Sequence, residues 1–221
     1  MKSLIEYINE SNQVELASDG KERGFDYVDL GLPSGTMWAT CNVGGDKPED
    51  YGLLFQFGHV DGYAYNDSNN QFKTNDQNLE DTNNEYIPLT SSGKTYKVND
   101  ILDLADDAPH INMGGKWRMP TKDELEELLD NTTQEVVTIN GVKGMMFTSD
   151  INGHQLFIPF AGYWYNGIFA SAGSHADVWS SQVHPSNGNY AYELTCNSNG
   201  NARINYYYRS FAFSVRGVFK K

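Results

Sequence analysis

The sequence predicts an α+β fold in which short, irregular β-sheets and long loops surround one firm central helix. Short runs of aromatic and β-branched residues follow one another through most of the 221 residues, and Gly, Pro and Asn separate them. One segment near the middle of the chain combines helical periodicity with an N-terminal capping pattern. Because strand patterns dominate and one strong helix interrupts them, we expect an α+β domain with a loop-rich sheet.

The central helix is predicted to begin after Thr121 and to end near Asn131. Thr121 is an N-cap residue and Glu124 follows three positions later, which makes a capping box. The acidic residues of the first turns, 123–127, favour the positive end of the helix dipole, so we interpret them as structural and not catalytic. The buried face of this helix is expected to consist of Leu125, Leu128 and Leu129.

Short strands are expected on both sides of this helix. Their predicted ranges are 27–30, 37–43, 53–57, 136–139, 144–148, 155–160 and 211–219. The three ranges that follow the helix read as a meander with turns at 140–141 and 152–153, where Asn precedes Gly. Residues 61–84 are rich in Asn and Asp and have little to bury, so we expect a long surface excursion there.

The N-terminal residues 1–24 are expected to form a helical leader and linker ahead of one domain over 25–221. Leu4, Ile5 and Ile8 lie on one helical stripe within residues 2–10, and the polar stretch 11–24 reads as a linker. The helix either docks on the body, the interpretation that we favour, or assembles chains or fastens them to a larger particle. No uninterrupted apolar segment follows Met1, so a secretory signal peptide is absent or was removed.

Composition excludes some partners. A net charge of −13 argues against nucleic acid, whose phosphates need clustered Lys and Arg, and against an anionic membrane surface. No apolar run approaches the roughly 20 residues that cross a bilayer, so we expect no membrane insertion. Cys41 and Cys196 lie far apart and allow either one disulfide or two buried thiols, of which we favour the thiols.

The last third of the chain has the composition of a recognition surface. Residues 165–217 are rich in Tyr, Asn, Ser, Gly and Phe and contain no Lys and no Met. Tyr, Ser, Gly and Asn are the residues that binding loops favour, because they combine aromatic area of low entropy cost with adaptable hydrogen bonding. An aromatic and apolar scaffold runs through the same segment, so the sequence predicts polar contact residues held on a rigid frame.

Four blocks of sequence resemble a known family. They are residues 27–44, residues 117–121 with Glu124, residues 158–163, and residues 179–181 with 213–216. Together they resemble the large paralogous family of gut-anaerobe proteins with a C-type-lectin-like fold, which is related to the formylglycine-generating-enzyme branch. The most similar members look like the variable proteins of diversity-generating retroelements, which are surface or phage-tail receptors. The resemblance covers about residues 25–219; Gly217 and Ala212 depart from it, where relatives often carry Pro and Gly.

The resemblance implies a ligand-binding display protein whose contact residues are diversified. In that family an error-prone reverse transcriptase alters adenines, mostly at Asn-type codons, which cannot become Lys, Gln, Glu, Met or Trp codons. Ordinary composition would place about ten such residues in a segment like 165–217, whereas it contains three, Trp179, Gln182 and Glu193. The alternative is a naturally Tyr- and Asn-rich lectin-like loop region that lost these residues by chance.

The resemblance also divides residues 165–217 into supports and contacts. The buried supports that it implies are Trp179, Ser180, Ser181, Ala191, Arg209, Phe213, Ser214, Val215 and Arg216. The ligand-binding positions that it implies are Ser174, His175, Asp177, Asn189, Tyr190, Asn205, Tyr206, Tyr207, Tyr208, Ser210 and Phe211. Weaker candidates on the preceding loop are Tyr165, Asn166, Ile168 and Phe169. Because side chains alternate along a strand, we expect two of the three tandem tyrosines 206–208 to reach the ligand.

Other site chemistries find little support in the sequence. Calcium-dependent lectins need carboxylates that 178–181 and 184–187 lack, and Asp61 and Asp67 read as solvated loop residues, not as Ca²⁺ ligands. Cys196 has no neighbouring Cys for oxidase chemistry, and the five histidines show no metal spacing. No nucleophile elbow or phosphate-binding loop is present. We therefore expect no cofactor, no metal and no catalytic residue.

These observations predict non-enzymatic recognition of a protein or glycan on a target cell or particle. The expected location is extracellular, at a cell surface or on a phage virion, and a homo-oligomer such as a trimer would suit a tail receptor. The alternative function is a fixed-sequence carbohydrate-binding or structural cell-surface module. An oxidase of the same fold is a third and weaker hypothesis.

Overall fold

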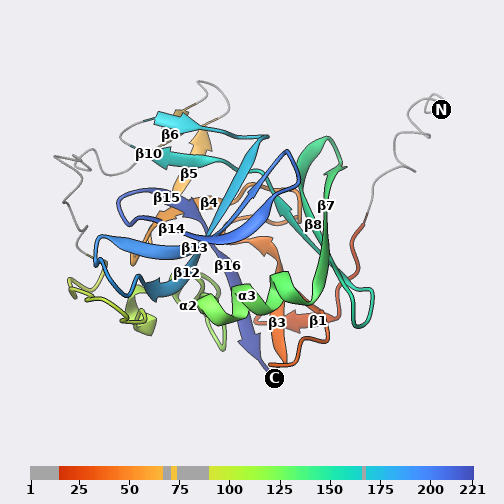
Figure 1. Cartoon of the computed structure of the whole chain (residues 1–221), viewed down its shortest axis with the longest axis horizontal. Coiled ribbons are helices and arrows are strands. Elements are labelled where there is room, and N and C mark those ends of the chain that lie inside the picture. Colours follow the sequence, from red (N-terminus) through yellow and green to blue (C-terminus); the bar gives the residue numbers. More distant parts are fainter. Residues whose placement is uncertain (1–14, 67–70, 74–89, 166–167) are drawn as a thin grey trace.

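Three β-sheets and two α-helices make up the described part of a computed structural model of the chain (Figure 1). That part comprises residues 15–66, 71–73, 90–165 and 168–221. Strands outnumber helices by far, so the chain is mostly β-sheet and belongs to an α+β or mainly-β class. The helix expected over residues 2–10 lies outside the described residues. Neither α-helix, of six and nine residues, approaches the length that crosses a membrane.

The first sheet joins the two ends of the described chain. Its strand order is β1-β2-β3-β16, with bounds β1 (Gly20–Glu22), β2 (Phe25–Asp29), β3 (Thr36–Asn42) and β16 (Arg216–Lys220). Val218 of β16 lies opposite Trp38 of β3, and both are fully buried. The linker expected to reach residue 24 is therefore wrong at its end, because β1 pairs with β2 and Asp19 N–H donates to the Tyr27 carbonyl (2.8 Å).

The second sheet carries most of the C-terminal third. Its main path is β14-β13-β12-β15-β4-β5-β6, with β10 on β15 and β11 on β10. The bounds are β4 (Leu53–Gln56), β5 (Tyr63–Asn66), β6 (Gln71–Lys73), β10 (Tyr163–Tyr165), β11 (Ile168–Ala170), β12 (His175–Val183), β13 (Tyr190–Asn197), β14 (Ala202–Tyr208) and β15 (Ala212–Ser214). Strands β5 and β6 fall in the expected excursion 61–84, which thus partly extends this sheet; residues 67–70 and 74–84 lie outside the described part.

The third sheet is the predicted meander. It consists of β7 (Thr132–Ile139), β8 (Val142–Ser149) and β9 (Gln155–Pro159), paired antiparallel in that order. Asn140 and Gly141 join β7 to β8 with φ values of 49° and 88°. Two consecutive positive φ values are what a two-residue type I′ hairpin turn requires, which is why Asn-Gly occurs there.

Helix α3 (Lys122–Asp130) confirms the predicted central helix. Thr121 Oγ1 accepts from the Glu124 N–H (3.2 Å), and Glu124 Oε2 accepts from the Thr121 N–H (3.0 Å), which is the predicted capping box. Leu125 and Leu128 are fully buried, and Leu129 packs beside them. The helix lies across the strands β12–β14 on one side and β7 on the other (Figure 1).

A second short helix was not predicted. Helix α2 (Ala108–Met113) follows the 3₁₀ turn η1 (Leu104–Asp106), and Asp107 caps it by accepting from the His110 N–H (2.9 Å). The sequence did contain a signal for this helix, because an N-cap residue such as Asp107 with Pro109 in the first turn is a helix-start pattern. Its six residues are too few to show a helical period.

Two large apolar clusters fill the space between the sheets. One contains Trp117, Trp179 and Phe213, and the other contains Trp38, Leu125 and Phe160. All nine residues expected to be buried supports between 179 and 216 are buried, so that prediction is confirmed. Cys41 and Cys196 are both free thiols, with Cys196 buried and Cys41 half-buried, so the expectation of two buried thiols holds fully only for Cys196.

Candidate functional site

The strands β12, β13 and β14 form a three-stranded ribbon whose two faces carry different side chains. Tyr190 lies opposite Tyr208, Ala191 opposite Tyr207, and Tyr192 opposite Tyr206. Since successive side chains point to opposite faces, Tyr207 lies on one face and Tyr206 and Tyr208 lie on the other. The predicted contact residues therefore do not share one surface but divide between two.

The first face carries a group of rings that we call the outer aromatic cluster. Its members are His184, Tyr190, Tyr192, Tyr206 and Tyr208. Ring centroids are 4.3 Å apart for His184 and Tyr206 and 4.5 Å apart for Tyr190 and Tyr208. Tyr206 is 47% exposed, and the Lys122 ammonium of α3 lies 5.5 Å from the Tyr192 ring centroid. This cluster offers aromatic faces and hydroxyl groups to solvent.

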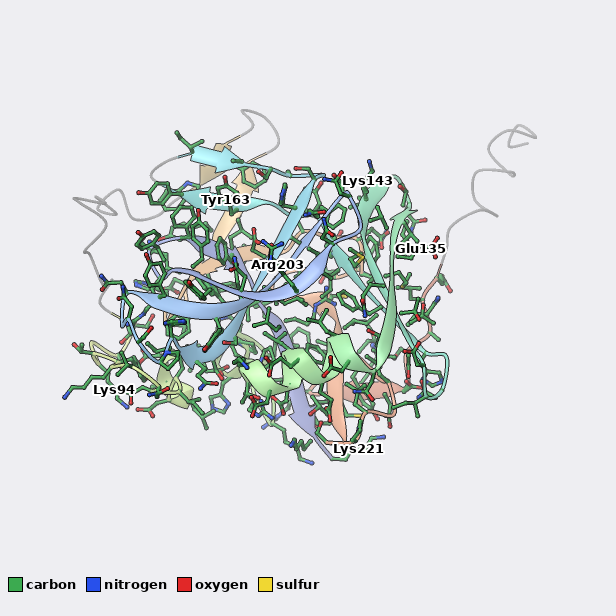
Figure 2. The ribbon with its side chains drawn as sticks, viewed as in Figure 1. Lys94, Glu135, Lys143, Tyr163, Arg203 and Lys221 are labelled. Carbon is green, nitrogen blue, oxygen red and sulfur yellow. The ribbon has the colours of Figure 1, made fainter. Side chains whose placement is uncertain are left out.

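The second face contains a cavity that we call the acidic pocket, with a volume of about 150 Å³. Tyr163 of β10, labelled in Figure 2, lies above β13 and β14 in that view and forms part of the pocket wall. The residues that line it are Tyr163, His175, Asp177, Glu193, Thr195, Asn205, Tyr207, Phe211 and Phe213. Five of these, His175, Asp177, Asn205, Tyr207 and Phe211, were predicted from the sequence.

Four rings make the apolar wall of the acidic pocket. Tyr207 meets Phe211 edge to face with centroids 4.5 Å apart, and Tyr163 lies 5.7 Å from Phe211 and 6.4 Å from Phe213. Edge-to-face arrangements of this kind are favourable and resist rearrangement. Tyr207 remains 38% exposed, whereas Phe211 is 8% exposed, so a ligand can contact Phe211 only from inside the pocket. The wall is therefore preformed.

Two carboxyl groups form the polar floor of the acidic pocket. Asp177 is 7% exposed and Glu193 is 1% exposed, and they lie on the same face of neighbouring strands. Burial raises the pKa of Asp177 to about 6, although Thr195 and His175 oppose the shift. Burial and the neighbouring Asp177 raise the pKa of Glu193 well above its ordinary value. Such a pair can share protons, donate to a neutral group, or accept a cation.

Glu193 is satisfied at only one of its two oxygens. Asn205 Nδ2 donates to Glu193 Oε1 (3.1 Å). Glu193 Oε2 is buried and has no hydrogen-bond partner within residues 15–66, 71–73, 90–165 and 168–221. A buried polar atom without a partner costs free energy, so in native proteins it calls for an explanation.

Buried hydrogen bonds hold the ribbon in place from behind. Trp179 Nε1 donates to the Phe55 carbonyl (2.9 Å), and Arg209 Nη1 donates to the Gly188 carbonyl (3.0 Å). Arg216, outside the ribbon, is fully buried and donates to Asn42 Oδ1, to the Ala39 carbonyl and to the Phe157 carbonyl, each at 3.0 Å, which joins β16 to β3 and β9. Burial lowers the pKa of both guanidinium groups to about 10, which still leaves them charged at neutral pH.

The remaining predicted contacts lie beside the two faces and are held by hydrogen bonds. Ser174 Oγ donates to the Ser171 carbonyl (2.9 Å), and the carbonyl of Asn189 accepts from the Arg209 N–H (2.9 Å). The Ser210 carbonyl accepts from Gln56 Nε2 (2.7 Å). Their backbones thus position the ribbon, while their half-buried side chains remain partly accessible.

The weaker loop candidates behave differently from one another. Tyr165 stacks on Phe211 with ring centroids 3.9 Å apart, so it supports the pocket wall from outside. Ile168 is 66% exposed and Phe169 is half-buried. Asn166 lies outside the described residues.

Sequence reasoning missed five participants. Tyr192 and His184 belong to the outer aromatic cluster, and Tyr163, Glu193 and Thr195 belong to the acidic pocket. The alternation of 191, 193 and 195 was readable as one strand face. The register that brings Glu193 beside Asp177 depends on pairing between β12 and β13, which no local pattern encodes.

Other sequence candidates do not assemble a site. Burial raises the pKa of the Cys196 thiol, so it is a poor nucleophile at neutral pH. Asp61 is exposed, and Asp67 lies outside the described residues. No group of three or more His, Cys, Asp or Glu side chains suited to a metal ion occurs in the described part of the chain.

Comparison of the chain with protein-family models, with curated proteins and with solved structures finds no match in any of the three. Function therefore has to be argued from the two faces of the ribbon.

Proposed function

We propose that this chain is a non-enzymatic recognition protein that binds a protein or glycan of another cell or particle through the β12–β14 ribbon. One observation carries the proposal: exposed aromatic side chains lie on strands whose supports are buried and hydrogen-bonded. Tyr206 and Tyr207 are 47% and 38% exposed, whereas Trp179 and Arg209 are 0% and 1% exposed. A rigid support lowers the entropy cost of binding, which for a flexible side chain is about 0.5–1.5 kcal/mol.

We further propose that the fold is C-type-lectin-like, as the four resembling blocks imply. Blocks that are distant in the chain meet in the structure, which supports the proposal. Arg216 of the last block donates to the Ala39 carbonyl of the first block (3.0 Å), and Trp117 of the second block lies in one apolar cluster with Ala39 and Phe213. These blocks therefore serve one shared core.

Diversification by a retroelement is part of the same proposal. Of the three residues in 165–217 that altered Asn-type codons cannot supply, Trp179 and Glu193 are 0% and 1% exposed. Gln182, near the end of β12, is half-buried and is the exception, so two of the three lie at positions with almost no exposed surface. The proposal places the protein at a cell surface or on a phage virion, where a homo-oligomer would multiply weak contacts.

The binding proposal is tested by panning phage-displayed random peptides and a glycan array against the wild-type chain, then measuring selected binders against variants. Tyr206→Ala should weaken binders of the outer aromatic cluster at least tenfold, and Tyr207→Ala should do the same for binders of the face that holds the acidic pocket, because each variant removes the exposed ring of its own face. Phe25→Ala is the matched control, since Phe25 is 38% exposed, as Tyr207 is, but lies on β2 in another sheet. Binders that lose equal affinity in Phe25→Ala would refute the assignment of this surface.

Diversification is tested separately by sequencing the locus from sibling isolates. Substitutions confined to residues 165–211, beside a template repeat and a reverse-transcriptase gene, are the expected result. An invariant segment would favour the alternative, a fixed-sequence carbohydrate-binding or structural module, while leaving the binding surface in place.

A further inference from the structure

We propose that the acidic pocket binds the side-chain cation of a lysine or arginine on the partner protein. The inference rests on the proposed function, since it assumes that the β12–β14 ribbon meets a ligand, and it names the chemistry of one contact. It follows from three features of the pocket: an unsatisfied buried oxygen, two carboxyl groups without ion pairs, and a preformed aromatic wall.

The unsatisfied oxygen is the most specific of these features. Glu193 is 1% exposed and lines the pocket, and its Oε2 has no hydrogen-bond partner among the residues that the structure describes. Asn205 engages only Oε1. An ammonium or guanidinium group entering the pocket brings N–H donors to that atom, and hydrogen bonds to charged groups are the stronger kind.

The charge around the pocket favours a cation. Asp177 and Glu193 both face it, and neither forms an ion pair within the described part of the chain. The positive groups that act on them are His175, beside Asp177 on β12, and Arg203 on β14, which is exposed. Arg203 lies on the strand at the front of the molecule in Figure 2. Two adjacent buried acids without a fixed counter-ion hold their protons more tightly, and a cation from outside would stabilise their ionised forms.

The size of the pocket fits one side chain. Its volume is about 150 Å³, below the roughly 300 Å³ at which pockets for drug-sized molecules begin. The walls are Tyr163, Tyr207, Phe211 and Phe213, whose π-faces attract cations and whose apolar area suits the methylene stem of Lys or Arg. A metal ion would not use this wall.

The competing occupant is a neutral hydroxyl group, as on a sugar, and pH separates the two. A cation prefers the ionised carboxyls, so its affinity should rise from pH 5 to pH 8 as Asp177 and Glu193 lose protons; burial raises the pKa of both. His175, Tyr163 and Tyr207 also line the pocket. Burial raises the pKa of Tyr207, so its hydroxyl stays neutral over this range. A hydroxyl that accepts from protonated Glu193 should bind more weakly as pH rises.

The experiment titrates the full chain with N-acetyl-lysine N-methylamide and its arginine counterpart, while ¹³C NMR follows the side-chain carboxyl signals. The norleucine counterpart has the same stem without the charge and is the matched ligand control; methyl glucoside represents a neutral hydroxyl ligand. Expected is saturable binding of the lysine or arginine probe, at least tenfold tighter than norleucine and tightening with pH. Equal binding of norleucine or preference for the glucoside would overturn the proposal. So would the absence of binding by either cation up to about 50 mM, a concentration on the order of the Kd of a weakly bound single residue.

Substitutions in the acidic pocket test whether the cation binds there. Glu193→Gln and Asp177→Asn keep the shape of the pocket but remove charge, and each should lower the affinity for the cation at least tenfold at pH 7.5. Glu135→Gln is the control, because Glu135 is exposed on β7 at the opposite side of the molecule from Tyr163 (Figure 2). An unchanged affinity in Glu193→Gln would exclude the pocket as the binding site.

Failure of this inference and failure of the proposed function are distinguishable. Selected peptides that need Tyr207, on the face of the acidic pocket, but bind Glu193→Gln at full affinity would uphold the recognition surface and refute the cation pocket. The comparison between Glu193→Gln and Glu135→Gln also removes the general attraction of basic peptides to a chain of net charge −13.

Discussion

Two buried glutamates, Glu124 at the start of α3 and Glu193 on β13, have opposite surroundings. Glu124 is 6% exposed and accepts from Arg118 Nη1 (2.7 Å), Arg118 Nη2 (2.6 Å) and Thr36 Oγ1 (3.1 Å) in addition to its capping bond. Glu193 is 1% exposed and accepts one bond, from Asn205. Burial alone therefore does not distinguish a structural carboxylate from a candidate binding group; the count of satisfied oxygens does.

The same contrast appears in the two pKa values. Burial of Glu124 would raise its pKa, but the hydrogen bonds from Arg118 and Thr121 outweigh it and hold the pKa at about 2. Burial and Asp177 raise the pKa of Glu193 instead. Glu124 therefore contributes stability that is present above pH 4.5 and is lost as pH falls toward 2, whereas the Asp177–Glu193 pair contributes stability at low pH that is lost as pH rises.

The largest expected effect is that of Glu124→Ala, which should lower the free energy of unfolding by about 3 kcal/mol. The substitution removes the capping box and leaves Arg118 and Thr36 without their acceptor. Urea unfolding measures the change. Glu126→Ala on the same helix is the control: its ion pair with Lys122 joins half-exposed side chains, so it should cost less than about 1 kcal/mol. Equal losses of unfolding free energy in the two variants would show that the hydrogen-bonded Glu124 stabilises the fold no more than a surface carboxylate does.

The next effect is a gain of stability in Asp177→Asn. A pKa of about 6 in the folded chain, against an ordinary value of 3.8, means that the folded state holds the proton longer between pH 4 and pH 6. Wild-type stability should therefore fall across that window by up to about 3 kcal/mol, and the variant should lack this fall.

Urea unfolding of wild type and Asp177→Asn at pH 3.5 and pH 7.5 measures this window. Asp61→Asn, at an exposed side chain, should leave the pH profile unchanged. A variant that follows the wild-type profile would show that Asp177 is not the titrating group.

The smallest effect is expected for Asn205→Ala, which removes the single hydrogen bond to Glu193 Oε1 and should cost about 1 kcal/mol. A double-mutant cycle with Glu193→Ala, which removes the acceptor, measures how much of this cost belongs to the pair, since the two side chains are in contact. If the two costs simply add, Asn205 stabilises the fold independently of Glu193. Glu193 would then gain no stability from its one hydrogen bond, and it would differ from Glu124 even more than the structure suggests.

Much of the fold was predictable because local patterns encode it. The Thr121–Glu124 capping box, the Asn140–Gly141 turn and the alternation within 206–208 each depend on neighbours in the sequence, and each is present in the structure. The short α2 and the strand β1 were missed because six and three residues carry too little periodicity. The split of the predicted contacts into two faces required the registers of three strands.

The sequence by itself determined which residue types are presented and which support them: the composition of 165–217 and the order of buried and polar positions predicted a framed, tyrosine-rich ribbon. Only the tertiary structure decided that Asp177 and Glu193 lie side by side against four aromatic rings. Pairing of β12 with β13 and the approach of β10 and β15 bring these side chains together across 50 residues, from Tyr163 to Phe213. Such contacts depend on strand register and packing, which are properties of the whole sheet and not of any local segment.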